Sequence, residues 1–360
     1  MKQTLARARV EIDLGALQRN GAAVARRAGV PLLPMIKADA YGLGASAALR
    51  ALEALEPWGF GVATVAEGEE LRTLGVTRPV VIFTPLHELD FPRARALRLT
   101  PTLGFPREIE AWQHAGGGTW HLSIDTGMSR AGIPWREIDS IVQVVALAPP
   151  EGAFTHFHSA ELDDGTLYTQ EKRFREAISR LPSRPKLLHT DNSAAFARHG
   201  RSDWDLVRPG IFLYGVGSGT SAAIQPEPVV SLRAPIVEIR KLEAGETVSY
   251  NAAFRAERPA RIATLSVGYA DGYPRALSGT GSVLIGGTIA PIAGMVTMDM
   301  TMIDVTTVRC EVGDAATLIG RSGSTALTVE RVADTAGISP YELLTGLRSR
   351  VERTYTGPEN

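Results

Sequence analysis

The chain has 360 residues, of which 44% are apolar and 21% are charged, and its formal net charge is −1. This composition is ordinary for a folded chain with a large core, so it excludes a disordered protein. There is no long Lys/Arg run and no apolar run of 18 residues, which argues against nucleic acid and membrane as partners. We therefore expect a small-molecule substrate.

The single cysteine, Cys310, rules out an internal disulfide and a structural zinc site, and we interpret it as a small hydrophobic residue. The first residues, MKQTLARARVEIDLGAL, lack the uncharged apolar core of a signal peptide. The sequence thus predicts a cytoplasmic protein without a metal site.

Short apolar runs alternate with longer amphipathic segments from residue 30 to about 212, a pattern typical of βαβ units with a parallel sheet. The amphipathic segments, for example 66–75 and 169–181, predict outer helices. Eight apolar runs predict a closed (β/α)8 barrel of the TIM type: 31–37, 59–64, 79–83, 99–103, 121–126, 152–157, 187–192 and 205–211.

The pattern changes after residue 219, where Gly, Ser and Pro cluster, and we place a domain boundary near residue 230. The barrel would then occupy residues 1–230, and residues 231–360 would form a mostly β C-terminal domain. Short β-branched runs, a helix over 328–337 and a final strand are expected there.

Polar residues follow the predicted barrel strands, at the ends that build the active site in (β/α)8 enzymes. They are Lys37, Asp125 with Arg130 just beyond, His156, Asn192 with Ser193, and Arg208. Partial desolvation at the barrel mouth would lower the pKa of Lys37 and make its amine a nucleophile suited to a Schiff base. A solvated lysine at a strand end is the alternative.

Tyr41, Ser193 and the backbone at Gly210 would lie where such barrels commonly hold phosphate. Gly210 would let a backbone N–H approach an oxyanion without a Cβ in the way. Helix capping in the segment DNSAAF explains Ser193 equally well.

Arg208 lies in an otherwise apolar strand, where an unpaired guanidinium would be costly to bury. A cofactor ring nitrogen or a carboxylate would serve as its partner, and an ion pair with Asp205 is the structural alternative. His156 could likewise be a hydrogen-bonded core histidine.

The stretch PMIKADAYGLGA, residues 34–45, resembles the pyridoxal-lysine signature of alanine racemases, a family of fold-type III pyridoxal-phosphate enzymes. The resemblance continues to PYELLTGLRSRV near the C-terminus. It implies that Lys37 binds pyridoxal phosphate as a Schiff base and that Arg208 faces its pyridine nitrogen. The phosphate would be held by Tyr41, Ser193, Tyr341 and the amides near Gly210 and Ile211.

The resemblance also implies interconversion of L-alanine and D-alanine by two bases, Lys37 and Tyr250, supplying D-alanine for peptidoglycan. Tyr250 would come from the partner subunit of a head-to-tail homodimer and would be tuned by His156. Arg130 would hold the cofactor's phenolic oxygen and the substrate carboxylate. The substrate entrance would be lined by Tyr269, Met298 and Asp299.

The sequence departs from the family pattern at three positions. Ser123 stands where a lysine that becomes carbamylated commonly braces Arg130, and Leu43 and Asn251 replace a common histidine and glycine. We therefore keep a broad-specificity or serine racemase of the same fold as an alternative. A fold-type III decarboxylase, a non-catalytic pyridoxal-phosphate-binding protein and a cofactor-free Schiff-base aldolase are more distant ones.

Overall fold

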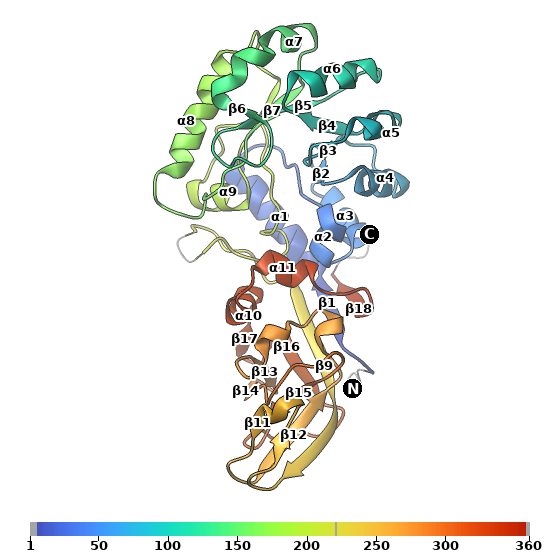
Figure 1. The fold of residues 1–360 in the computed structure, drawn as a ribbon, viewed down its shortest axis with the longest axis vertical. Coiled ribbons are helices and arrows are strands. Elements are labelled where there is room, and N and C mark those ends of the chain that lie inside the picture. The colour runs from blue at the N-terminus through green and yellow to red at the C-terminus, as the bar shows by residue number, and fades with distance from the viewer. Residues whose placement is uncertain (1–5, 220–221, 358–360) are drawn as a thin grey trace.

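A computed structural model of the chain describes residues 6–219 and 222–357, which form two lobes (Figure 1). Apart from the first strand, β1 (Arg9–Asp13), the blue to green elements form an α/β lobe, and the yellow to red elements form a mostly β lobe beside it. Within the described ranges, no helix is long and apolar enough to cross a membrane.

The α/β lobe contains six parallel strands that pair in chain order, and six of the eight predicted strands are found there. A two-residue strand, β6 (Ile133–Pro134), pairs with the fourth of them. The six are β2 (Phe60–Val62), β3 (Val80–Ile82), β4 (Thr100–Leu103), β5 (His121–Asp125), β7 (Gly152–Phe154) and β8 (Leu187–His189).

The remaining two predicted strands close the barrel as single bridges. Parallel bridges join Leu32 to Val207 and Met35 to Gly61, and the amide of Leu33 donates to the carbonyl of Val207 at 2.8 Å. These segments contain three prolines, Pro31, Pro34 and Pro209, which have no N–H for a regular ladder. The predicted (β/α)8 barrel is confirmed, with its first and last strands shortened by proline.

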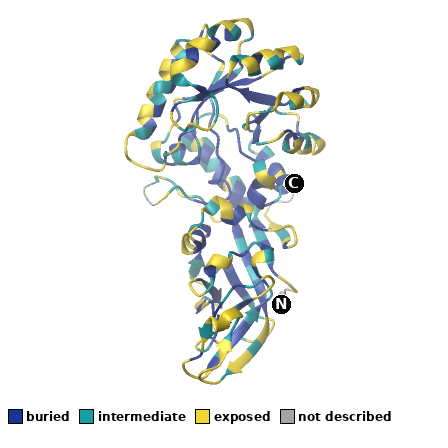
Figure 2. Cartoon of the chain, in the orientation of Figure 1, coloured by how far each residue is buried: buried dark blue, intermediate teal, exposed yellow. Residues whose placement is uncertain are grey.

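Outer helices cover the barrel sheet, as the exposed and buried faces in Figure 2 show. Between β6 and β7, a 3-10 helix, Trp135–Ile141, leads directly into α7. The helices of this lobe are α1 (Leu14–Ala28), α3 (Ala45–Glu53), α4 (Val65–Thr73), α5 (Phe91–Ala96), α6 (Pro106–His114), α7 (Val142–Leu147), α8 (Thr166–Ser179) and α9 (Ser193–His199).

The second lobe is built around a mixed sheet with the order β14-β13-β16-β9-β1-β18. The first strand of the chain, β1 (Arg9–Asp13), lies in this sheet, between β9 and β18, although residues 1–230 were expected in the barrel. The other strands of the lobe are β9 (Val230–Leu242), β10 (Thr247–Val248), β11 (Phe254–Arg255), β12 (Ala260–Leu265), β13 (Ser282–Ile285), β14 (Thr288–Pro291), β15 (Thr301–Asp304), β16 (Ala315–Ser322), β17 (Thr325–Leu327) and β18 (Glu352–Thr356).

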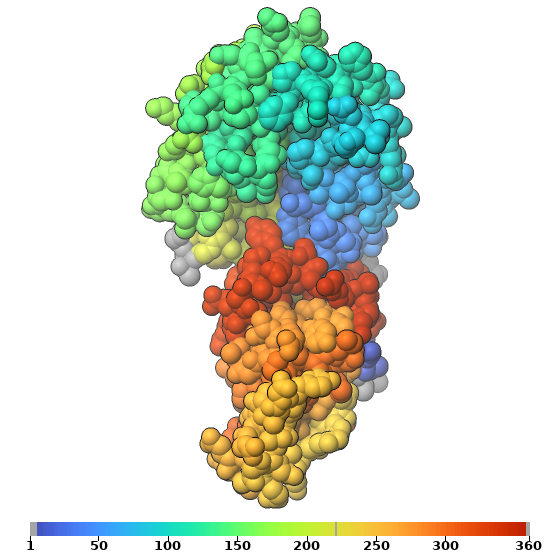
Figure 3. All heavy atoms as spheres, in the orientation of Figure 1, coloured from blue at the N-terminus to red at the C-terminus, as the bar shows by residue number. Residues whose placement is uncertain are grey.

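Two helices lie between β17 and β18 in the chain, α10 (Val329–Ala336) and α11 (Pro340–Thr345), and α11 contacts the barrel lobe. Figure 3 shows its red atoms directly against the barrel lobe. A Cβ on Gly42 would lie 2.6 Å from the carbonyl oxygen of Leu344, so only glycine admits this approach. The contact carries Tyr341, on α11, to the barrel mouth.

Candidate active site

The segment that carries Lys37 is a left-handed turn, α2 (Lys37–Gly42). Ala38, Asp39, Ala40 and Tyr41 all have φ between 52° and 59°. Each such L-residue costs roughly 1–2 kcal/mol relative to a right-handed turn. This strain sets the direction of Lys37 and Tyr41, and it concentrates at the motif that the sequence singled out.

Carboxylates hold the strained turn at both ends. Glu67 accepts from the amide of Ala38 at 2.8 Å and from that of Ala63 at 2.6 Å. Asp39 accepts from the amide of Ala45, which begins α3, at 2.6 Å. Sequence reasoning missed Glu67, whose only signal was its place in a Thr-x-x-Glu capping box with Thr64 at the start of α4.

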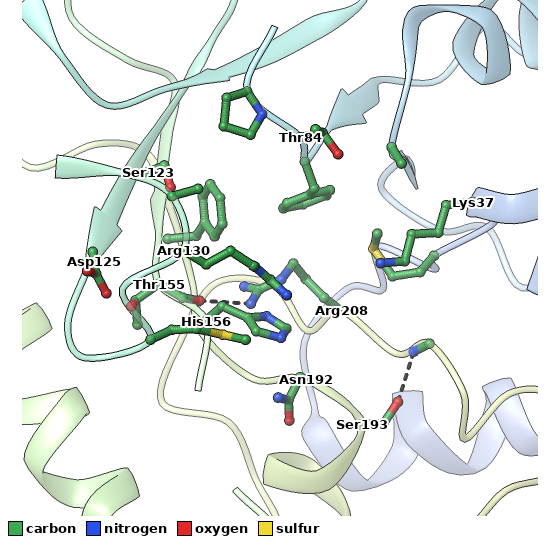
Figure 4. Close-up of a pocket in the computed structure, with 18 of the residues that line it drawn as sticks. Lys37, Thr84, Ser123, Asp125, Arg130, Thr155, His156, Asn192, Ser193 and Arg208 are labelled. Carbon is green, nitrogen blue, oxygen red and sulfur yellow. Dashed lines mark hydrogen bonds between the residues drawn. The ribbon is translucent and has the colours of Figure 1, made fainter. Parts of the chain in front are cut away.

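A cavity of about 670 Å³ opens at the carboxyl ends of the barrel strands (Figure 4). Its lining includes nine of the residues proposed to hold a cofactor: Lys37, Tyr41, Arg130, His156, Ser193, Arg208, Gly210, Ile211 and Tyr341. The barrel thus brings together residues that are separated by as much as 300 positions in the chain.

Lys37 is partly buried and points toward the cavity (Figure 4). Burial lowers the pKa of its amine, the positive charge of Arg130 lowers it further, and the carboxylate of Glu67 opposes both. A larger share of the amine is therefore neutral near pH 8 than in a free lysine. The neutral amine is the nucleophile that a Schiff base requires.

Three groups from distant segments meet at the start of α9: the Ser193 hydroxyl, the Gly210 amide and the Tyr41 hydroxyl. The hydroxyl of Ser193 accepts from the amide of Gly210 at 2.9 Å. A Cβ at position 210 would lie 2.4 Å from the hydroxyl of Tyr41, so glycine at this position lets that hydroxyl approach the backbone. Burial raises the pKa of Tyr41, which keeps its hydroxyl a donor.

Ser193 is the first residue of α9 but is not its N-cap. Asn192 is the N-cap of α9, and its side chain accepts from the amides of Ala194 and Ala195, both at 3.1 Å. The hydroxyl of Ser193 faces Gly210 instead. Capping therefore does not explain Ser193.

Arg208 is buried and has no ion pair with Asp205. Its guanidinium donates to the carbonyl oxygens of Thr155 at 2.8 Å, of Thr190 at 3.0 Å and of His189. Asp205 pairs with Arg184 at 2.7 Å instead. Burial lowers the pKa of Arg208 to about 10, which leaves it a cation and an obligatory donor at neutral pH.

His156 lies beside three cations in the cavity wall. Burial and then the charges of Arg208, Arg130 and Lys37 lower the pKa of His156 to about 3. Its imidazole is therefore neutral at physiological pH and can accept a hydrogen bond on one ring nitrogen while it donates from the other.

Arg130 projects into the cavity (Figure 4). Among residues 6–219 and 222–357, no acceptor lies within hydrogen-bond distance of its guanidinium. Ser123 is buried beside its loop, and a Cβ on Gly132 would lie 2.6 Å from the Ser123 hydroxyl. The guanidinium is free to receive a carboxylate.

Four proposed residues do not line the cavity of their own chain. Tyr250, Tyr269 and Met298 are exposed in the second lobe, with 71%, 39% and 53% of their surfaces accessible. Asp299 accepts from Arg350 at 2.6 Å. Within the described ranges, the cavity of one chain is therefore lined by Tyr41 and Tyr341 but not by Tyr250 or Tyr269.

Several cavity residues were not predicted from the sequence. They follow the ends of strands β3, β5 and β7 directly, so the same search along the strand ends could have found them. They are Phe83, Thr84, Pro85, Met128 and Thr155.

The electrostatics of Lys37 predict how the pH controls Schiff-base formation. In the apoenzyme, the rate of reaction with pyridoxal phosphate should rise with pH to a plateau, with a midpoint below the value of about 10.4 for free lysine. Glu67→Gln should move the midpoint down because that carboxylate raises the pKa of Lys37, and Arg130→Met should move it up.

Stopped-flow absorbance between pH 6.5 and 10.5 measures this rate. Glu70→Gln removes an exposed carboxylate of the same helix and serves as the control. Midpoint shifts of the opposite signs, or the same shift in the control, would contradict the electrostatic assignment.

The fold and the cavity define a class of protein: a (β/α)8 barrel with a half-buried lysine of lowered pKa at its mouth, among buried polar side chains. Residues 12–218 match the family described as alanine racemase, N-terminal domain, and residues 229–355 match alanine racemase, C-terminal domain. The chain belongs to the alanine racemase family.

Similar proteins share this fold over nearly their full length. Alanine racemases of Deinococcus radiodurans and Citrifermentans bemidjiense are 39% and 38% identical, over 97% of this chain and 99% and 98% of theirs. The crystal structure of alanine racemase from Bartonella henselae, with covalently bound pyridoxal phosphate, has a TM-score of 0.91 at 29% identity. It covers 98% of this chain and 100% of that one.

Proposed function

We propose that the protein interconverts L-alanine and D-alanine with pyridoxal phosphate as its cofactor. The observation that carries the proposal is the cavity itself, where the amine of Lys37 has a lowered pKa and Arg130 has an uncommitted guanidinium. The hydroxyls of Ser193 and Tyr41 beside Gly210 would hold the phosphate, and the buried guanidinium of Arg208 would donate to the ring nitrogen. Family membership supports the same assignment.

Different residues of the chain would bind the cofactor, bind the substrate carboxylate and transfer protons. Pyridoxal phosphate, when bound, withdraws electrons from the substrate and so acidifies its Cα proton. Lys37 would hold the cofactor and move a proton on one face of the substrate, and Arg130 would bind the carboxylate. Inversion needs a second proton-transferring group on the opposite face, and we assign this role to Tyr250 with neutral His156 beside it.

We propose that Tyr250 reaches the cavity from a second copy of the chain, in a head-to-tail homodimer. Its exposure in one chain supports this, because a catalytic tyrosine cannot act from the surface of a separate lobe. Residues 231–360 would cover the barrel mouth of the partner, and Tyr269, Met298 and Asp299 would line the entrance. We place the enzyme in the cytoplasm as a source of D-alanine for peptidoglycan, in line with its family.

A broader substrate range is the second candidate, and Ser123 favours it. Serine cannot form the carbamate that the family's common lysine provides, so Arg130 lacks that brace. The carboxylate site then has more freedom to accept a larger amino acid such as serine.

The test is formation of D-alanine from L-alanine by the purified protein supplied with pyridoxal phosphate, followed by chiral chromatography. We expect equal amounts of the two enantiomers at equilibrium. L-Serine is run in parallel: comparable rates would establish the broad enzyme, and turnover of neither substrate would refute the proposed function.

A further inference from the structure

Arg208 begins a series of polar side chains that crosses the barrel interior. Its Nη1 lies 3.0 Å from Nδ1 of His189, and Nε2 of His189 lies 2.9 Å from Nδ1 of His121. Nε2 of His121 lies 3.6 Å from a carboxylate oxygen of Glu151. His121 begins β5, and Glu151 precedes β7, so the series runs from the barrel mouth to the opposite end of the strands.

The positions of the protons in this series follow from Arg208. A guanidinium only donates hydrogen bonds, so Nδ1 of His189 must be an acceptor and its proton must lie on Nε2. That proton is donated to Nδ1 of His121, which places the His121 proton on Nε2, facing Glu151. Burial lowers the pKa of both histidines, in agreement with two neutral rings.

The rings are held in place by dedicated packing. Phe154 stacks on His189 at 5.3 Å with an angle of 5° between the planes, and Trp58 packs on His121 at 5.8 Å. A Cβ on Gly152 would lie 2.8 Å from Nδ1 and Cε1 of His121. Glycine at this position therefore provides the space that the His121 ring occupies.

The end of the series carries a specific electrostatic feature. Within the described part of the chain, Nε2 of His121 is the one buried side-chain nitrogen or oxygen without a hydrogen-bond partner. An unsatisfied buried donor costs about 1–3 kcal/mol. The carboxylate of Glu151, whose side chain is 33% exposed, lies at ion-pair distance from it. His121 and Lys186 both lower the pKa of Glu151, so it is ionised at neutral pH.

We propose that Glu151, His121 and His189 are positioning residues for Arg208, an inference that rests on the proposed role of Arg208 toward the cofactor ring. The two neutral imidazoles carry the influence of a carboxylate at the far end of the barrel to a guanidinium at the mouth. Polarised hydrogen-bond series of this kind strengthen each bond in a low dielectric. They fix the rotation of Arg208 and support its charge, together with the nearby carboxylate of Asp191.

The first test is the tautomer of each histidine, measured by long-range 1H–15N correlation on 15N-histidine-labelled holoenzyme without substrate. We expect Nε2–H and an unprotonated Nδ1 for both His189 and His121. A proton on Nδ1 of His189 would overturn the proposal, because Arg208 could not donate to it.

The second test removes the charge with Glu151→Gln, restores it with Glu151→Asp, and uses Glu110→Gln on α6 as the exposed control. In Glu151→Gln, the Nε2–H signals of both histidines should shift, and kcat should fall about three- to tenfold, as a pKa change of half to one unit would give. The KM for L-alanine should stay within roughly a factor of two, since Glu151 touches no substrate.

Recovery of both readouts in Glu151→Asp would support a charge effect. A His189 signal and a kcat in Glu151→Gln that match the Glu110→Gln control would overturn the proposal. A wild-type protein that forms no D-alanine would refute the proposed function alone, because the tautomers and signal shifts are measured without substrate.

Discussion

Lys37→Ala should abolish both covalent binding of pyridoxal phosphate and the conversion of L-alanine to D-alanine. Lys37 is the lysine at the cavity, so the variant loses the Schiff base and one of the two proton-transferring groups together. Loss of such a group typically costs at least about 10³-fold in kcat. Borohydride reduction followed by mass spectrometry measures the covalent bond, and chiral chromatography measures the reaction.

Lys172→Ala is the matched control, because that lysine is exposed on α8 and remote from the proposed chemistry. It should retain both properties at the wild-type level. Covalently attached cofactor in Lys37→Ala, or activity within tenfold of wild type, would show that another amine performs the reaction.

The buried histidines should make the free energy of unfolding fall steeply at acidic pH. Burial holds the pKa of His156 at about 3 and lowers that of His121 and His189 below the ordinary value. The unfolded chain binds protons at these residues below about pH 6.5, and the folded chain does not until lower pH. Stability is thus complete above pH 6.5 and falls with decreasing pH by about 3–4 kcal/mol per unit, the slope for two to three protons.

Proton uptake on unfolding measures this effect directly and does not require a two-state transition. In unbuffered urea at pH 5.5, unfolding should take up about two to three protons per chain, and at pH 8 almost none from histidine. The variant His189→Gln should lower the uptake at pH 5.5 by about one proton. An uptake below one proton in the wild type would mean that the buried imidazoles are already protonated in the folded protein.

The sequence predicted the barrel well because its strands are short apolar runs bounded by helices of clear periodicity. The first and last barrel segments, 31–36 and 205–209, were also recognised as strands. Their reduction to single bridges was not, because it depends on which backbone amides the neighbouring strands need for hydrogen bonds. The place of β1 could not be predicted. Its pairing with β18 joins residues about 340 positions apart, and an alternating five-residue strand fits either lobe.

The part of the candidate site that could be predicted from the sequence consists of polar residues at the ends of predicted strands. Lys37, His156 and Arg208 follow strands and line the cavity. The partners of Arg208 were not predictable, because three of them are backbone carbonyls, which no residue pattern encodes. The left-handed turn after Lys37 was also missed, since alanine and tyrosine ordinarily avoid that conformation and tertiary contacts such as that of Glu67 hold it.

The central claim is that each active site combines Lys37 of one chain with Tyr250 of another, and a heterodimer tests it most directly. Lys37→Ala and Tyr250→Phe chains, each with its own affinity tag, are co-expressed, and the doubly tagged dimer is purified. Each homodimer should be nearly inactive. If the sites are shared, one site of the heterodimer has both native residues, and we predict about half of the wild-type racemisation rate. A heterodimer as inactive as the two homodimers would contradict the account, because both residues would then belong to the same chain's site.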